Sequence, residues 1–238
     1  MPNGPVKIYR PLLETIGDIT LSLSLLCACL YMLNENFSFN VPPVILKTSS
    51  FAFIAMFIAV NTRNIHHTIL LLSVIIIAVT MLQTFDITAP PELKFYGLRA
   101  VIFALLAALF FLNRMPLISI KTRRLNISAV ISSVTILVSY WVFPKLNEHI
   151  NEYALFNFAL LITATMAVLS RFPLRLVGFG MTLFFLAELA NYVAFFVPTT
   201  DETLYLSWAT LYLGTLFTVV GVMLDEGFTS TRYRYHHH

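Results

Sequence analysis

The chemistry open to this chain rests on a few ionisable residues that interrupt long apolar stretches. Glu188 is flanked on both sides by Phe, Leu and Ala residues, and Lys47 lies about one helical turn inside another such stretch. A charge in hydrocarbon costs at least about 2.5 kcal/mol on the insertion scale, so ionisable residues found there usually mark a site or a buried pair. Asn191 follows Glu188 by three residues and shares its helix face. These three residues are the first candidates for a site.

Two other ionisable residues have simpler explanations. Asp18 lies in the first turns of its stretch, where it can snorkel or pair with Arg10. Arg99 lies near the outer end of its stretch, and we expect its guanidinium to reach the lipid headgroups. We expect Lys47 and Glu188 to approach each other in the interior, because two isolated charges in hydrocarbon cost more than a hydrogen-bonded pair.

Neither a metal site nor a cofactor site is predicted. Cys27 and Cys29 are two positions apart on one helix and point in nearly opposite directions, so they are interpreted as packing residues. His66 and His67 have no carboxylate or cysteine close in sequence. The patterns HExxH, CxxC, GxSxG and GxxxxGK[ST] do not occur, which leaves zinc, serine-hydrolase and P-loop chemistry without support.

Apolar segments fill most of the sequence and must position these residues. Hydrophobic residues make up 58% of the chain and charged residues 11%, against about 25% charged residues in soluble domains. A helix of about 20 apolar residues spans the hydrocarbon core of a bilayer. We therefore predict an all-α membrane protein with a bundle of eight transmembrane helices. Residues 1–235 form a single polytopic domain, and residues 236–238 are interpreted as a tag remnant. The predicted helices cover 13–32, 43–60, 68–85, 95–112, 125–143, 153–169, 174–197 and 204–224.

The distribution of charge predicts the orientation of these helices. Short cytoplasmic loops are enriched in lysine and arginine. Alternate connections hold Lys7, Arg10, Arg63, Arg114, Lys121, Arg123, Arg124, Arg171, Arg175, Arg232 and Arg234, whereas the opposite ones hold mainly acidic residues. Both termini are therefore predicted to be cytoplasmic. The net charge of +3 reflects this topology and gives no support to a nucleic-acid partner.

Several segments resemble the YhhN lysoplasmalogenase family, eight-helix membrane proteins that cleave the vinyl-ether bond of lysoplasmalogens. The family's seventh helix has the form G-A-x-L-F-x-x-S-D, and residues 180–188 (GMTLFFLAE) are similar, with Glu188 at the aspartate position. Residues 212–215 (YLGT) and Gly221 resemble its last helix, Y-x-x-A-Q-x-x-I-x-x-G, and Lys47 with Thr48 resembles its K-P motif. The resemblance implies a bacterial inner-membrane protein with a lysolipid site formed by Glu188, Lys47, Asn191, Tyr212 and Thr215.

Much of the family's catalytic pattern is missing. The glycine and aspartate of its third helix correspond to Ile76 and Ile77, and its fourth-helix histidine falls near Ala107. The glutamine of its last helix falls near Thr215. Vinyl-ether hydrolysis needs an acid to protonate carbon and a base to activate water. Glu188 can supply the acid, and no residue in the pattern clearly supplies the base.

Three functions remain open. The first is a diverged lysolipid hydrolase with Glu188 as general acid and Lys47 orienting the phosphate. The second is a non-catalytic protein that binds a membrane lipid, a lysolipid or a membrane-protein partner in the same cavity. The third is a small transporter or channel with Lys47 and Glu188 as a gating or proton-coupling pair. We favour the second, because most of the expected ionisable groups are missing, although the pair can also be purely structural.

The predicted topology can be tested with a reporter fused after Arg234. Because basic loops resist translocation, we expect the reporter to be active in the cytoplasm. Activity only in the periplasm would contradict eight crossings with both termini inside.

Overall fold

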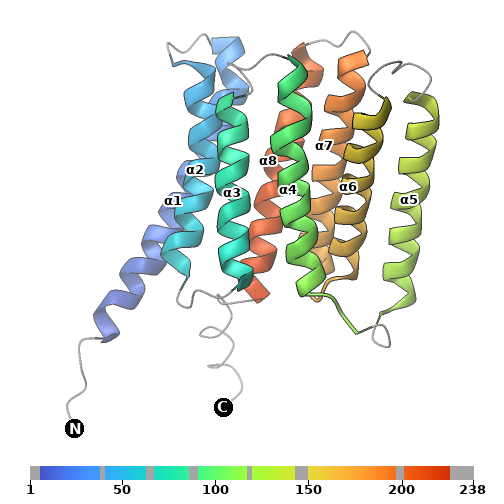
Figure 1. Cartoon of the computed structure of the whole chain (residues 1–238). Helices are drawn as coiled ribbons and strands as arrows, with labels where there is room; N and C mark the ends of the chain where they lie inside the picture. Colours follow the sequence, from blue (N-terminus) through green and yellow to red (C-terminus); the bar gives the residue numbers. More distant parts are fainter. Residues whose placement is uncertain are drawn as a thin grey trace. The chain divides into compact units, whose positions relative to one another are not determined.

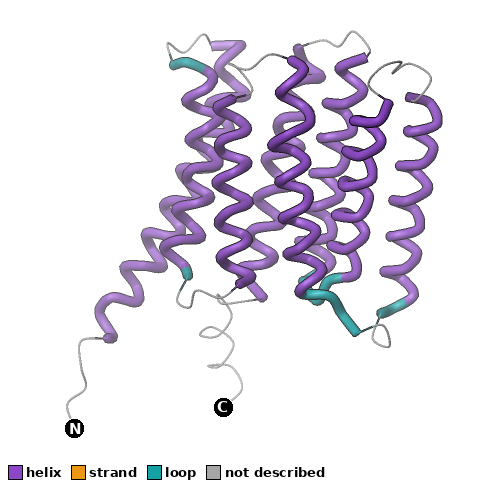
Figure 2. The backbone as a smooth tube through the Cα atoms, in the orientation of Figure 1, coloured by secondary structure: helices purple, strands orange, loops and turns teal. Residues whose placement is uncertain are grey.

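The computed structural model describes residues 6–37, 41–62, 67–85, 91–116, 120–142, 150–196 and 201–225, which are helical almost throughout (Figures 1 and 2). They form the eight α-helices expected, and these ranges contain no strand, only an isolated bridge between Arg114 and Ser170. The helices are α1 (Val6–Phe37), α2 (Pro43–Asn61), α3 (His67–Phe85), α4 (Pro91–Leu112), α5 (Thr122–Val142), α6 (Ile150–Leu169), α7 (Phe179–Phe196) and α8 (Asp201–Met223).

The start of the seventh helix differs from a regular α-helix. A π-helical turn, η4 (Leu174–Gly178), precedes α7 directly. Pro173 precedes this turn, and its carbonyl accepts hydrogen bonds from the N–H groups of Leu176 (3.1 Å) and Val177 (2.9 Å). Proline is tolerated at a helix start because the first N–H groups need no intrahelical partner. The sequence places the start of this helix correctly but gives no sign of the wider turn.

Within the described ranges, four helices are long and apolar enough to cross a membrane. They are Thr15–Asn34 within α1, Pro43–Asn61, His67–Thr84 and Tyr205–Met223, and shorter apolar helical segments cover Arg99–Leu112 and Asn157–Leu169. Helices suit this environment because they satisfy their own backbone hydrogen bonds where no water is present. The composition of these helices supports a membrane protein, while the full set of eight crossings stays a prediction.

The chain folds as two compact units, residues 1–88 with 223–238 and residues 89–222. In the first unit, α1 packs on α2 through small residues. The Ser24 hydroxyl donates a hydrogen bond to the Ser50 carbonyl (2.7 Å), and a Cβ at Gly17 would lie 2.4 Å from Asn61 Nδ2. Small side chains let helix backbones approach closely, which is how helices associate where no hydrophobic force acts between them.

The second unit holds α4 to α8. The C-terminal ends of α4 and α6 meet at one end of this unit. The Arg171 N–H donates to the Asn113 carbonyl (2.8 Å), and the Met115 N–H donates to the Leu169 carbonyl (3.1 Å). These bonds join the segment after α4 to the segment after α6. The two basic connections, which the charge pattern assigns to one side of the membrane, therefore lie at the same end of this unit.

Within the second unit, three residues of α8 that are seven positions apart contact α7 and the π-helical turn that precedes it. The Ser207 hydroxyl donates to the Ala187 carbonyl (3.0 Å). A Cβ at Gly214 would lie 2.7 Å from the Gly180 carbonyl oxygen, and one at Gly221 would lie 2.6 Å from a methyl carbon of the Val177 side chain. A seven-residue spacing keeps one stripe of a helix facing its neighbour. The stripe of small residues on α8 therefore lets the two backbones touch.

This contact predicts that Gly214→Ala destabilises the protein. The added methyl group would overlap backbone atoms that cannot swing aside, so we expect the free energy of unfolding to fall by about 1–3 kcal/mol. Unfolding by sodium dodecyl sulfate, followed by circular dichroism in detergent micelles, measures this change. Leu213→Ala is the control, because Leu213 is exposed on the same helix. Equal stability of Gly214→Ala and the wild type would contradict the close contact.

Candidate functional site

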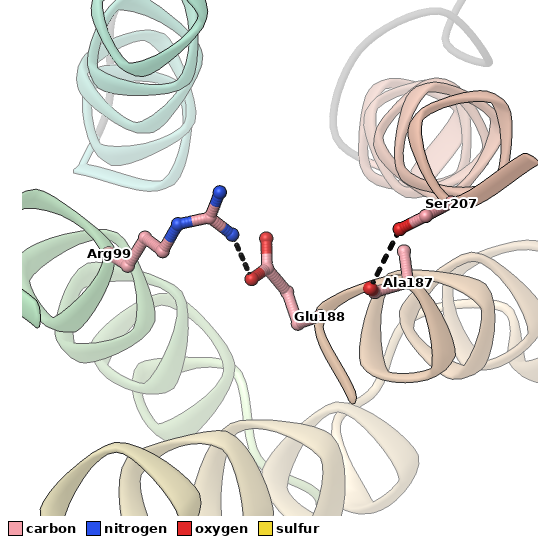
Figure 3. Close-up of polar contacts among 4 residues, drawn as sticks. All are labelled: Arg99, Ala187, Glu188 and Ser207. Carbon is pink, nitrogen blue, oxygen red and sulfur yellow. Dashed lines mark hydrogen bonds and ion pairs between the residues drawn. The ribbon is translucent and has the colours of Figure 1, made fainter. Parts of the chain in front are cut away.

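A buried ion pair joins α4 to α7 inside the second unit. The Arg99 guanidinium donates to the Glu188 carboxylate, and the two side chains are only 5% and 2% exposed (Figure 3). The expectation that Arg99 reaches the lipid headgroups is therefore wrong. Glu188 has the buried position that its apolar neighbours indicated, and a basic partner from another helix lies against it.

The same two helices make a second contact one turn away. Phe103 follows Arg99 by four residues and Phe184 precedes Glu188 by four, and their rings meet edge to face with centroids 5.5 Å apart. Residues four apart lie above one another on a helix face. The ion pair and the ring pair thus form two successive contacts between α4 and α7, which run in opposite directions. Edge-to-face packing is a favoured arrangement of aromatic rings.

The environment of the pair determines its chemistry. Taking two charges out of water costs several kcal/mol per ion, and their attraction offsets this only when they are paired in good geometry. A general acid needs a carboxyl proton directed at the substrate. In this arrangement the Glu188 carboxylate instead accepts from a guanidinium that is always charged. The geometry is that of a fixed ion pair within the helix packing.

The structure describes Lys47 in the first unit, where it is half-buried on α2. Its ammonium lies 5.0 Å from the centroid of the Tyr31 ring on α1. A cation over the face of an aromatic ring is stabilised by the ring's electron density. Glu188 belongs to the second unit, so the approach of Lys47 to Glu188 stays a prediction.

The remaining predicted binding residues lie on α7 and α8. The Asn191 side chain falls outside the part of the chain that the structure describes. Tyr212 is buried and stacks on Trp208 with ring centroids 5.7 Å apart. Thr215 is also buried, and its hydroxyl donates to the Leu211 carbonyl of its own helix (2.9 Å). Both residues therefore take part in the packing of α8.

Among the described residues, no group of three or more His, Cys, Asp and Glu side chains is arranged to hold a metal ion. Arg99 is the functional candidate whose role the sequence did not reveal. One sequence signal for the pairing was available: a phenylalanine lies four residues after Arg99 and another lies four residues before Glu188. That signal requires knowing that α4 and α7 are neighbours, which the sequence alone does not say.

No protein-family model matches the chain, and neither a curated protein nor a solved structure matches it at a significant level.

The ion pair predicts a characteristic pattern in a double-mutant cycle. Arg99→Met and Glu188→Leu should each lower the free energy of unfolding by about 3–5 kcal/mol, because each leaves one buried charge without its counter-ion. The double substitution removes both charges and should recover most of that loss. The same dodecyl sulfate titration measures all three variants. Losses that add in the double variant would mean that the two residues do not act as a pair.

Proposed function

We propose that this chain is an integral membrane protein that binds a membrane lipid or lysolipid among its helices and does not hydrolyse it. The proposal includes eight crossings with both termini in the cytoplasm, in a bacterial inner membrane. The observation that carries it is the Arg99–Glu188 pair, because it engages the carboxylate that a hydrolase would need as its acid.

The residues at the expected partner positions support the same conclusion. Ile77, which falls where the resemblance implies a catalytic aspartate, is apolar and 50% exposed, and it is directed away from the core of α1 to α3. Ala107, near the position of the expected histidine, has no group that can move a proton. Activation of water needs a base at hydrogen-bond distance from it. Neither position supplies one.

The outer surface of α5 supports contact with lipid. Val130, Ile136, Leu137 and Tyr140 are 62%, 63%, 68% and 81% exposed. Exposed apolar surface of this extent marks an interaction site for a membrane or another protein. An acyl chain requires only such apolar surface and a suitable shape. Binding can therefore persist where catalytic groups are missing.

The test compares aldehyde release from a lysoplasmalogen by the purified wild type and by Glu188→Gln. We expect the same background rate in both, since the carboxylate does not donate a proton to the substrate. Binding of a radiolabelled lysolipid, measured in the same detergent, should be retained by both proteins. Turnover by the wild type that Glu188→Gln abolishes would overturn the proposal and establish a hydrolase.

A further inference from the structure

A half-open groove of about 640 Å³ lies in the second unit, between the start of α5 and the segment that leads into α7. Pockets for small molecules commonly have volumes of about 300–1,000 Å³. Four of the groove's described lining residues are basic, namely Lys121, Arg123, Arg124 and Arg175, and none of the described lining residues is acidic. Four positive charges around one cavity strongly favour an anionic ligand.

Arg124 holds the walls of the groove together. Its guanidinium donates to the carbonyls of Val168 (2.8 Å), Ser170 (2.5 Å) and Phe172 (3.2 Å), at the end of α6 and in the segment after it. These bonds attach the first turn of α5 to the segment that forms the opposite wall. Partial burial lowers the pKa of Arg124, but the ordinary value is so high that the side chain stays charged.

The other three basic residues come from both walls and are exposed. Lys121 directly precedes α5, Arg123 lies in its first turn, and Arg175 belongs to the π-helical turn on the opposite side. The long helix α5 also begins beside the groove, at Thr122. The N-terminal end of a helix carries a partial positive charge that adds to that of the side chains.

The groove has an apolar part beside these cations. Ile127 and Leu174 are half-buried in its wall, and Phe179 adds an exposed ring. The Thr182 hydroxyl donates to the Gly178 carbonyl within the same helical segment (2.8 Å). A free inorganic anion needs only polar partners, whereas a lipid presents a charged headgroup joined to hydrocarbon. The combination of cations and apolar wall fits the lipid.

We propose that this groove binds the phosphodiester headgroup of an anionic phospholipid. Lys121, Arg123 and Arg175 contact the headgroup, and the apolar wall contacts the first part of the acyl chains. The inference rests on the proposed lipid-binding role and adds its location and headgroup class. Basic pockets between membrane helices bind anionic headgroups, and the basic-loop pattern assigns this end to the cytoplasmic leaflet, where the surface potential is negative.

A matched pair of variants separates the groove from general basicity. Lys121→Gln/Arg175→Gln removes two charges from the groove. Arg114→Gln/Arg171→Gln removes two exposed charges from the same end of the unit that do not line the groove, where Arg114 lies over the Phe111 ring (4.6 Å) and Arg171 over the Phe172 ring (5.7 Å). Ile127→Trp is a third variant, which fills the groove and keeps every charge.

Binding is measured with purified full-length protein in detergent micelles, using fluorescent dioleoyl phosphatidylglycerol displaced by unlabelled lipids. We expect phosphatidylglycerol to bind at least about tenfold more tightly than dioleoyl phosphatidylcholine. The groove double variant should weaken phosphatidylglycerol binding about thirtyfold, the control double variant less than about threefold, and Ile127→Trp about tenfold or more. Circular dichroism and size-exclusion chromatography verify that each variant is folded.

Several outcomes would overturn the inference. Equal weakening by the two double variants would show attraction to general surface charge, and unchanged binding by Ile127→Trp would show that the groove is not entered. Displacement by millimolar sodium phosphate as effective as that by lipid would assign the groove to a free anion. If the wild type binds neither of these lipids nor the radiolabelled lysolipid, the proposed function itself fails. Binding of the lysolipid without binding of phosphatidylglycerol, or equal binding of both phospholipids by the wild type and all variants, refutes the groove site alone.

Discussion

The absence of water from the hydrocarbon core is the constraint on which the rest of the structure depends. Each charged or polar group placed there must find its partner within the protein. Arg99 and Glu188 meet this requirement for each other across α4 and α7. Some hydroxyl groups meet it across helices, as when Thr163 donates to the Phe103 carbonyl of α4 (2.9 Å) and so joins α6 to α4. Many others donate to a carbonyl four residues earlier in their own helix. Polar residues of the described helices thus either link two helices or bond within their own helix.

Close backbone contact provides the second kind of link. Lipid tails are as apolar as leucine side chains, so burial of leucine gives no advantage to one helix pair over another. The small residues on α8 solve this problem by allowing close contacts with the π-helical turn and the first half of α7, from Val177 to Ala187. This packing also limits function, because the faces of α7 and α8 that touch at Gly180 and Gly214 leave no room for an acyl chain between them. A lipid must therefore contact other surfaces of these helices.

The sequence predicted the helices well and the site only in part. Eight apolar segments of the right length were sufficient to predict eight helices, because hydrophobic length is a direct physical requirement for crossing a bilayer. Glu188 was identified as buried because its immediate neighbours are all apolar. The partner of Glu188 was missed, since Arg99 lies 89 positions away and only the packing of α4 on α7 brings it close. The groove was missed for the same reason: Lys121 and Arg175 each satisfy the rule for cytoplasmic loops, and their convergence depends on the Arg124 bonds.

The π-helical turn at Leu174–Gly178 lies between Pro173 and α7, and it sets the rotation with which α7 begins. A regular α-helix rotates by about 100° per residue, so one residue inserted anywhere would rotate everything beyond it. A wide turn accommodates one additional residue within a single loop of backbone. Part of the groove wall belongs to this turn, so a change of one residue in the length of the turn would alter the groove while Glu188 keeps its alignment with Arg99.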